Sequence, residues 1–190
     1  GLTATDTLAR LTNVGGSTHV LDVCCGLGGP ARYLARHYGS RVTGIDLNQS
    51  RVDGAVRLTK MVGLEGKASF YHANALSSAL PSAGFDSLIS QEAFCHIPNK
   101  PELLTECLRV LKPGGLIAFT DILEGTSMTT PVRERLRQEM TFMELNTLDS
   151  YRTLLETSGC EIKMAEDLSE EWARILIDRL AMYRGLKDQT

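Results

Sequence analysis

A glycine-rich segment followed by an acidic residue is the part of this sequence best suited to chemistry. The segment LDVCCGLGGP closes an apolar run and places Gly26 and Gly28 just before Pro30, which favours the first turn of a helix. Because glycine lacks a Cβ, a ligand can approach the backbone of such a loop closely. Asp46 ends the next apolar run about 20 residues later, a spacing at which a carboxylate accepts hydrogen bonds from ribose hydroxyls. The pair predicts a nucleoside site; the alternative is that Asp46 only forms a turn with Asn48.

The sequence of this loop favours a nucleoside site over a dinucleotide site. Nicotinamide-binding loops use G-x-G-x-x-G, whose third glycine lets the helix pack close to the strand. Arg32 stands here where a small residue is needed in one register. A nicotinamide-dependent oxidoreductase is therefore the weaker alternative.

His96 is the side chain best placed for acid–base catalysis. It lies in QEAFCHIPNK, just beyond an apolar run. An imidazole titrates near neutral pH and can take a proton from an attacking amine or orient it. The alternative is a solvent-exposed histidine that caps the loop before Pro98, and both interpretations stay open.

Strand-like and helix-like segments alternate through most of the chain. Strands are expected at 19–25, 41–47, 68–72, 85–90 and 116–123, and helices at 30–38, 50–62 and 101–111. Such alternation predicts βαβ units, and hence an α/β fold with a doubly wound, mostly parallel sheet. Ligands bind beyond the carboxyl ends of the strands in these sheets. The loops after the first four strands should therefore converge on one site.

Composition is that of an ordinary globular protein. The 190 residues include 43% hydrophobic and 23% charged residues. A net charge of −3 and an isoelectric point near 5.8 argue against a nucleic-acid partner. No apolar run is long enough to span a membrane, and the first residues do not resemble a secretion signal.

The five cysteines indicate reduced thiols. Their odd number and the absence of C-x-x-C spacing argue against both a disulfide framework and a zinc site, and no other metal site is expected. A cytoplasmic protein is therefore expected.

We expect one domain over 1–190, made of three parts. A core at 18–123 is followed by a lid or substrate-binding insertion at 124–150 and by C-terminal helices and a strand at 151–190. The insertion contains an amphipathic helix whose apolar face, Leu136, Met140 and Met143, is expected to pack against the core or lid. The last part should hold a sixth strand at 161–165 and a helix at 170–183.

The order of five motifs identifies a family resemblance. LDVCCGLGG, GIDLN, HANAL, FDSLISQEAFCHI and LRVLKPGGLIAFTD, within 20–123, resemble the class I S-adenosylmethionine-dependent methyltransferases. Within that superfamily they look most like small-molecule N-methyltransferases of the sarcosine/dimethylglycine and phosphoethanolamine type. The ubiquinone/menaquinone C-methyltransferases are more distant. The resemblance implies a Rossmann-like fold and S-adenosyl-L-methionine as the cofactor.

It also implies which residues surround the methionine part of the cofactor. Gly26 and Gly28, with the backbone of Cys24 and Cys25, would wrap the methionine and the sulfonium. Asp22, on the strand below, would orient the ammonium group. Cys24 stands where the family commonly has a glycine, which leaves the loop geometry open.

The remaining implied contacts involve the adenosine and the far side of the methionine. Asp46 would bind the ribose diol, and Leu47 would pack against the adenine. Asn74 occupies a position where the family commonly has an aspartate that binds the adenine amine; its amide can both accept and donate. Ala75 lies beside it, and Gln91 would meet the methionine.

The resemblance implies an enzyme that transfers a methyl group from S-adenosyl-L-methionine to a small-molecule acceptor, and an amine nitrogen is the expected acceptor atom. The alternatives are C-methylation of the ubiquinone/menaquinone type and a cofactor-binding module without activity of its own. Compared with the family, both ends of the chain are expected to be shortened. The sequence does not indicate an oligomeric state.

Overall fold

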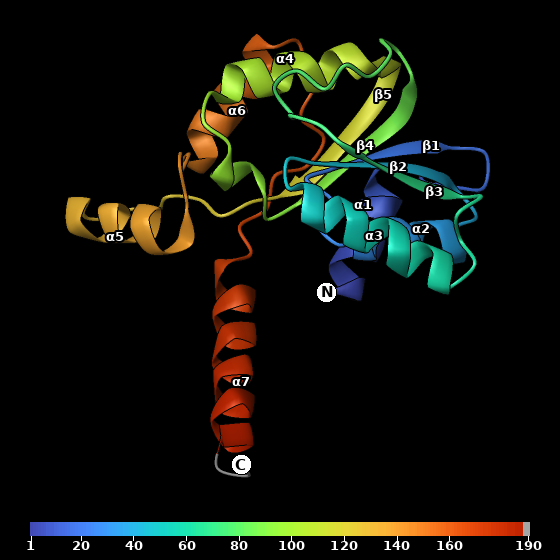
Figure 1. The fold of residues 1–190 in the computed structure, drawn as a ribbon. Helices are drawn as coiled ribbons and strands as arrows, with labels where there is room; N and C mark the ends of the chain where they lie inside the picture. The colour runs from blue at the N-terminus through green and yellow to red at the C-terminus, as the bar shows by residue number, and fades with distance from the viewer. Residues whose placement is uncertain (188–190) are drawn as a thin grey trace. The chain divides into compact units, whose positions relative to one another are not determined.

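The fold alternates strands and helices along the chain, as expected from the sequence (Figure 1). A computed structural model describes residues 1–187. Its strands are β1 (His19–Val23), β2 (Arg41–Asp46), β3 (Ala68–His72), β4 (Phe85–Gln91) and β5 (Leu111–Thr120). Its α-helices are α1 (Leu2–Leu11), α2 (Gly29–His37), α3 (Gln49–Met61), α4 (Lys100–Val110), α5 (Thr130–Met140), α6 (Leu148–Thr157) and α7 (Ser169–Lys187). A 3₁₀ turn, η1, spans Phe94–His96.

The five strands form one parallel sheet in the order β3-β2-β1-β4-β5. The order reverses between β1 and β4, so the switch point lies at the carboxyl end of β1. This topology confirms the doubly wound α/β fold.

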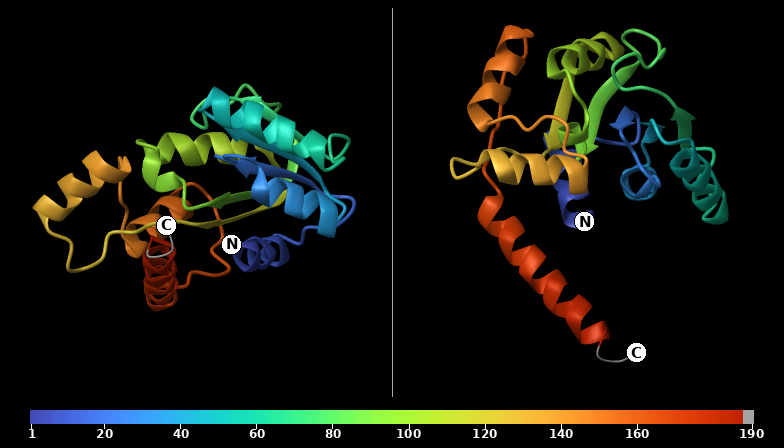
Figure 2. Two further views of the ribbon diagram at one scale, coloured as in Figure 1. Left: turned by 60° about the horizontal axis from the view of Figure 1, so that its bottom comes forward. Right: turned by 60° about the vertical axis from the view of Figure 1, so that its left-hand side comes forward.

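The sheet has an apolar core on each face, because successive side chains of a strand point to opposite faces. Val20, Val42 and Ile89 pack with residues of α1, α2 and α3, whereas Leu21 and Leu88 pack with residues of α4. The two groups of helices accordingly lie on opposite sides of the sheet (Figures 1 and 2).

Local sequence explains where the helices next to the site begin. The Asn48 side chain caps α3 by accepting from the Arg51 amide at 3.2 Å. Asn99 likewise caps α4, where its side chain accepts from the Glu102 amide at 3.4 Å. Pro30 occupies the first turn of α2.

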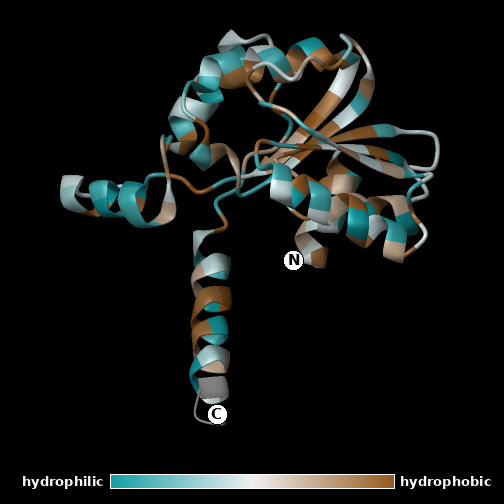
Figure 3. Ribbon diagram, viewed as in Figure 1, coloured by the Kyte–Doolittle hydropathy of each residue, from teal (hydrophilic) through white to brown (hydrophobic). Residues whose placement is uncertain are grey.

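Three expectations about the elements were wrong. Residues 161–165 form no strand; a strand needs a paired neighbour, and β5 pairs with β4 alone in the described residues. The helix α5 buries no residue and leaves Met140 52% exposed, because most of its residues are polar or charged, as its mainly hydrophilic colour in Figure 3 shows. β5 begins at Leu111, five residues earlier than expected, since Leu111 pairs with Phe85 before an irregular stretch.

Two further features of the chain are relevant to the site. The helix α1, which the sequence did not predict, buries Thr5, Leu8 and Ala9. The chain divides into a compact unit from Gly1 to Cys160 and a second from Glu161 onward.

Within residues 1–187, no helix combines the length and apolar character needed to cross a membrane.

Candidate active site

The glycine-rich loop and the end of β2 are joined by hydrogen bonds. The Cys25 amide donates to the Ile45 carbonyl at 2.9 Å, and the Gly26 amide donates to Oδ2 of Asp46 at 2.9 Å. Oδ1 of Asp46 accepts from the Asn48 amide at 2.9 Å. The turn with Asn48 thus exists, yet a carboxylate has about four acceptor sites, so hydroxyl groups can still bind Asp46.

Two glycines of the loop meet different constraints. Gly26 has a φ of +53°, and a Cβ there would meet nothing within 4 Å, so the backbone is open to a ligand. Gly28 has a φ of +72°, and its Cβ would lie 2.6 Å from the Phe70 ring. Gly28 is therefore required by packing as well as by backbone conformation.

Cys24 adopts a backbone conformation that normally favours glycine. Its φ is +61°, in the left-handed region. Burial, with the carboxylates of Asp46 and Asp22 nearby, raises the pKa of the Cys24 thiol to about 12. The thiol is therefore protonated at neutral pH and is no nucleophile.

Asp22 lies on β1 directly beneath the start of α2 and is 2% exposed. A backbone hydrogen bond from Ala31 supports its carboxylate, but its Oδ2 has no partner. Burial, together with the nearby Asp46 charge, raises the pKa of Asp22 to about 7. A buried carboxylate with a free oxygen is a strong acceptor for a cationic ligand.

Gln91 and Thr120 add two more polar atoms without partners on the face of the sheet that carries Asp22. They are register partners on β4 and β5, and the Nε2 of Gln91 and the Oγ1 of Thr120 are buried without a hydrogen bond. Oε1 of Gln91 accepts from Thr5 Oγ1 at 3.2 Å. Because Asp22 pairs with Ile89, two residues before Gln91, all these side chains share one face of the sheet.

The residues expected around the adenine lie at the ends of β2 and β3. Leu47 is 68% exposed, so an apolar surface is open there. Oδ1 of Asn74 accepts from the Leu76 amide at 3.0 Å, which forms a turn, and the Asn74 side chain is exposed. Ala75 is buried in the core on the α4 face. Their contacts with a cofactor stay a prediction.

His96 lies in the 3₁₀ turn after β4, with its ring exposed. Its Nδ1 lies 3.0 Å from the Thr141 carbonyl oxygen and 3.2 Å from Thr141 Oγ1. A carbonyl oxygen can only accept, so Nδ1 carries the proton and Nε2 is the unprotonated nitrogen of the neutral ring. The ring also packs against Phe142, with centroids 5.2 Å apart. These ring contacts are with Thr141 and Phe142 and not with the loop before Pro98, and they leave Nε2 as the nitrogen that can accept a proton.

Several residues near the site were not found by sequence reasoning. Thr5 lies on the unpredicted helix α1, and Thr120 ends an apolar strand. Lys100 is wholly buried and Tyr151 nearly so. Of these residues, only Lys100 could have been noticed in the sequence. A lysine at the start of an expected helix is unusual, because its charge opposes the helix dipole.

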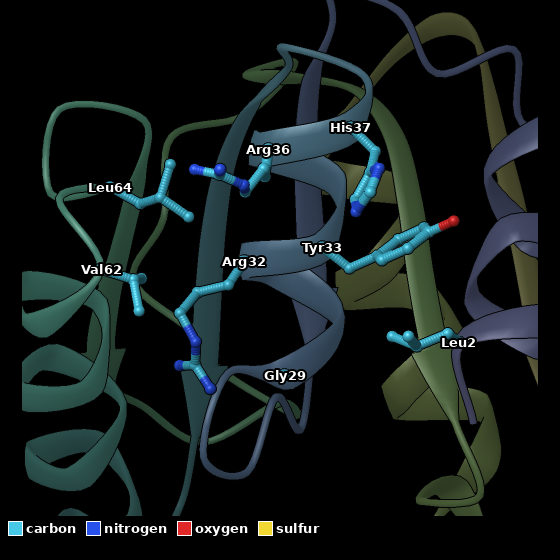
Figure 4. Close-up of a pocket in the computed structure, with 8 residues that line it drawn as sticks. All are labelled: Leu2, Gly29, Arg32, Tyr33, Arg36, His37, Val62 and Leu64. Carbon is cyan, nitrogen blue, oxygen red and sulfur yellow. The ribbon is translucent and has the colours of Figure 1, made fainter.

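A separate hollow lies over α2, away from these groups. Figure 4 shows Arg32 and Arg36 pointing to one side of the helix, toward Val62 and Leu64, and Tyr33 to the other. None of the residues expected to bind a cofactor lines it.

Comparisons with known proteins found similar sequences. A family described as methyltransferase domain matches residues 21–119. The chain is 40% identical over 177 residues to 24-methylenesterol C-methyltransferase 2 of Oryza sativa subsp. japonica, covering 87% of this chain and 49% of that protein. It is 28% identical over 189 residues to phosphoethanolamine N-methyltransferase of Triticum aestivum, covering 100% of this chain and 37% of that protein.

A solved structure gives the same fold. Phosphoethanolamine N-methyltransferase 2 of Haemonchus contortus, in complex with phosphomonomethylethanolamine and S-adenosylhomocysteine, matches with a TM-score of 0.89 and 21% identity, over 100% of this chain and 44% of that one. The chain thus spans less than half the length of these relatives. The family match over 21–119 contains the glycine-rich loop, Asp46, Gln91 and His96. The chain belongs to the methyltransferase domain family.

Proposed function

We propose that this chain binds S-adenosylmethionine and transfers its methyl group to an amine nitrogen of a small molecule. The observation that carries the proposal is the set of unpartnered polar atoms on Asp22, Gln91 and Thr120. They lie on one face near the carboxyl ends of β1, β4 and β5, next to a loop whose backbone is open at Gly26. Buried polar atoms without partners are rare in folded proteins, so these three atoms support the binding of a polar ligand.

The polarity of these groups fits the methionine part of the cofactor. Asp22 supplies an acceptor for its ammonium group, and the Gln91 amide supplies a donor for its carboxylate. Asp46 supplies acceptors for the ribose diol, and exposed Leu47 supplies an apolar contact for the adenine. Asn74 and Ala75 flank the adenine end of the proposed site. Cys24, Cys25, Gly26 and Gly28 form the loop next to the methionine.

Little further chemistry is asked of the protein. When bound, the cofactor supplies an activated methyl group on a sulfonium. The residues need to align the acceptor, exclude water and remove a proton from an amine that arrives protonated. Unprotonated Nε2 of His96 is the group that accepts this proton, which leaves the amine lone pair free to attack.

The compartment and partners follow from weaker observations. Free cysteines are typical of reducing compartments, which supports a cytoplasmic location. The acidic balance of the chain supports a small-molecule acceptor and no nucleic acid. The preference for nitrogen rests on the likeness to phosphoethanolamine N-methyltransferases and on the His96 tautomer.

Calorimetry with S-adenosylhomocysteine tests the cofactor site. We expect binding by the chain, no binding of NADH, and an affinity at least about tenfold lower in Asp46→Ala, because hydrogen bonds to a charged acceptor contribute roughly 1.5–3 kcal/mol. An unchanged affinity in Asp46→Ala would leave Asp46 as a turn residue. Binding of NADH alone would overturn the cofactor assignment.

Transfer of a labelled methyl group tests the acceptor. We expect phosphoethanolamine or a related small amine to be labelled and His96→Ala to lower the rate by about 10²–10⁴-fold at unchanged cofactor affinity. Labelling of a sterol alkene instead would favour C-methylation, the second candidate, which the 40% identity to a sterol C-methyltransferase supports. Binding without transfer to either class would leave a cofactor-binding module.

A further inference from the structure

Lys100 is a fully buried cation at the first turn of α4. Its Nζ donates to the Ile97 carbonyl at 2.7 Å and to the Glu144 carbonyl at 3.0 Å. Lysine is almost never fully buried unless it is paired, and a positive charge at a helix N-terminus opposes the helix dipole. Helix stability therefore does not explain this lysine; the two carbonyls that it joins do.

The second carbonyl belongs to a strap, defined here as residues 141–146, which crosses the segment after β4. The amides of Met143 and Glu144 donate to the Cys95 carbonyl at 2.9 and 3.3 Å. The Asn99 amide donates to Oε2 of Glu144 at 2.8 Å. Lys100 adds the contact that joins the backbone of the strap to the backbone just before α4.

The surroundings of Lys100 compensate for its charge. Glu144 and Asp121 face it as carboxylates, and the Cys95 thiol lies nearby. Asp121 is itself held in place, since it accepts from the Cys95 amide at 2.9 Å and from the Tyr151 hydroxyl at 2.6 Å. Burial lowers the pKa of Lys100, and these acidic groups oppose that shift.

The strap also fixes His96. Thr141, at the start of the strap, provides the carbonyl that accepts from Nδ1 of His96. Phe142, the next residue, packs against the ring. The tautomer of His96 therefore depends on where the strap lies.

We propose that Lys100 is a positioning residue that fastens the strap to the segment after β4 and thereby holds His96 with Nδ1 protonated and Nε2 free. The inference rests on the proposed function only for what His96 does to an amine. How the ring is held is independent of any substrate. Free imidazole favours the opposite tautomer, with the proton on Nε2, so loss of the strap contact has a direct signature.

Nuclear magnetic resonance of ¹⁵N-histidine-labelled protein measures this signature. The His96 signals are identified by their loss in His96→Gln. We expect the wild-type ring to carry its proton on Nδ1, and Lys100→Met, which keeps the chain length without a donor, to shift the ring toward Nε2–H. Lys60→Met, which removes an exposed lysine on α3, is the matched control and should leave the tautomer unchanged.

Three further measurements make the result decisive. In Lys100→Met the amides of Met143 and Glu144 should exchange with deuterium at least tenfold faster, while cofactor-product affinity stays unchanged and the transfer rate falls about tenfold or more. If Lys100→Met does not fold, Lys100→Gln retains an amide NH₂ donor group on a shorter side chain and should show a mixed tautomer. A ring that keeps its proton on Nδ1 in the folded variant overturns the proposal. If the tautomer shifts but wild type methylates no acceptor, the proposed function fails and the positioning role stands.

Discussion

At the scale of single residues, the candidate site depends on carboxylates in buried positions, where a charge costs free energy. Asp22 and Asp46 are both buried, but their carboxylates are satisfied differently. Asp46 accepts two backbone amides, whereas one oxygen of Asp22 has no partner. Asp46 therefore stabilises the loop without a ligand, and Asp22 is the group that gains most from one.

Asp22 makes the stability of the free protein depend on pH. Its pKa is raised to about 7, so the folded state binds the proton more tightly than the unfolded state. The stabilisation is fully present below the unfolded pKa of about 4 and is lost as the pH rises through about 7. We expect the free energy of unfolding to fall by up to about 4 kcal/mol over this range and Asp22→Asn to remove that fall, as measured by urea denaturation.

The same experiment with ligand provides a control. Saturating S-adenosylhomocysteine, whose ammonium would face the ionised Asp22, should flatten the pH dependence of the wild type. A wild-type profile that Asp22→Asn reproduces would mean that other groups cause the fall. A slope that ligand leaves unchanged would mean that the ammonium binds elsewhere.

At the scale of elements, the sequence predicted what is encoded locally. The five strands and the helices α2, α3 and α4 follow from runs of neighbouring residues, and the turn of Asp46 with Asn48 joins residues two apart. The helix α1 was missed because its place is set at long range: Tyr38 and Tyr33 donate to Asp6 at 2.5 and 3.3 Å. The carbonyl of Glu144 that binds Lys100 is equally remote in sequence. No local pattern reports such pairs.

Gly28, in the loop between β1 and α2, is required both by its positive φ and by the lack of space for a Cβ, and these two requirements can be measured separately. Gly28 and Gly63 have similar φ values, +72° and +67°, but only Gly28 faces a neighbour, the Phe70 ring. Gly63→Ala should cost about 1 kcal/mol from backbone strain. Gly28→Ala should cost at least about 1–3 kcal/mol more from overpacking and also weaken S-adenosylhomocysteine binding.

Thermal unfolding and calorimetry of the two alanine variants measure this difference. Equal losses of stability would show that Phe70 moves aside and that only backbone conformation matters. Binding that is weakened in Gly63→Ala as well would point to a general loss of structure.

At the scale of the whole molecule, the two units contribute unequally to the core. The unit from Gly1 to Cys160 contains the sheet and every residue expected to bind the cofactor. Within the described residues, the second unit consists of a segment without regular structure and the helix α7 (Ser169–Lys187). The family match over 21–119 also falls within the first unit.

Removal of residues 161–190 should therefore leave cofactor binding intact. The hydrophobic core is untouched, so we expect the 1–160 chain to unfold cooperatively and to bind S-adenosylhomocysteine within about threefold of the full chain, as measured by calorimetry. Removal of residues 1–12 is the matched comparison. It deletes the buried side chains of Leu8 and Ala9 and the Thr5 contact to Gln91, so it should lower both stability and affinity. Lost binding in the 1–160 chain, with its folding retained, would assign part of the cofactor site to the second unit.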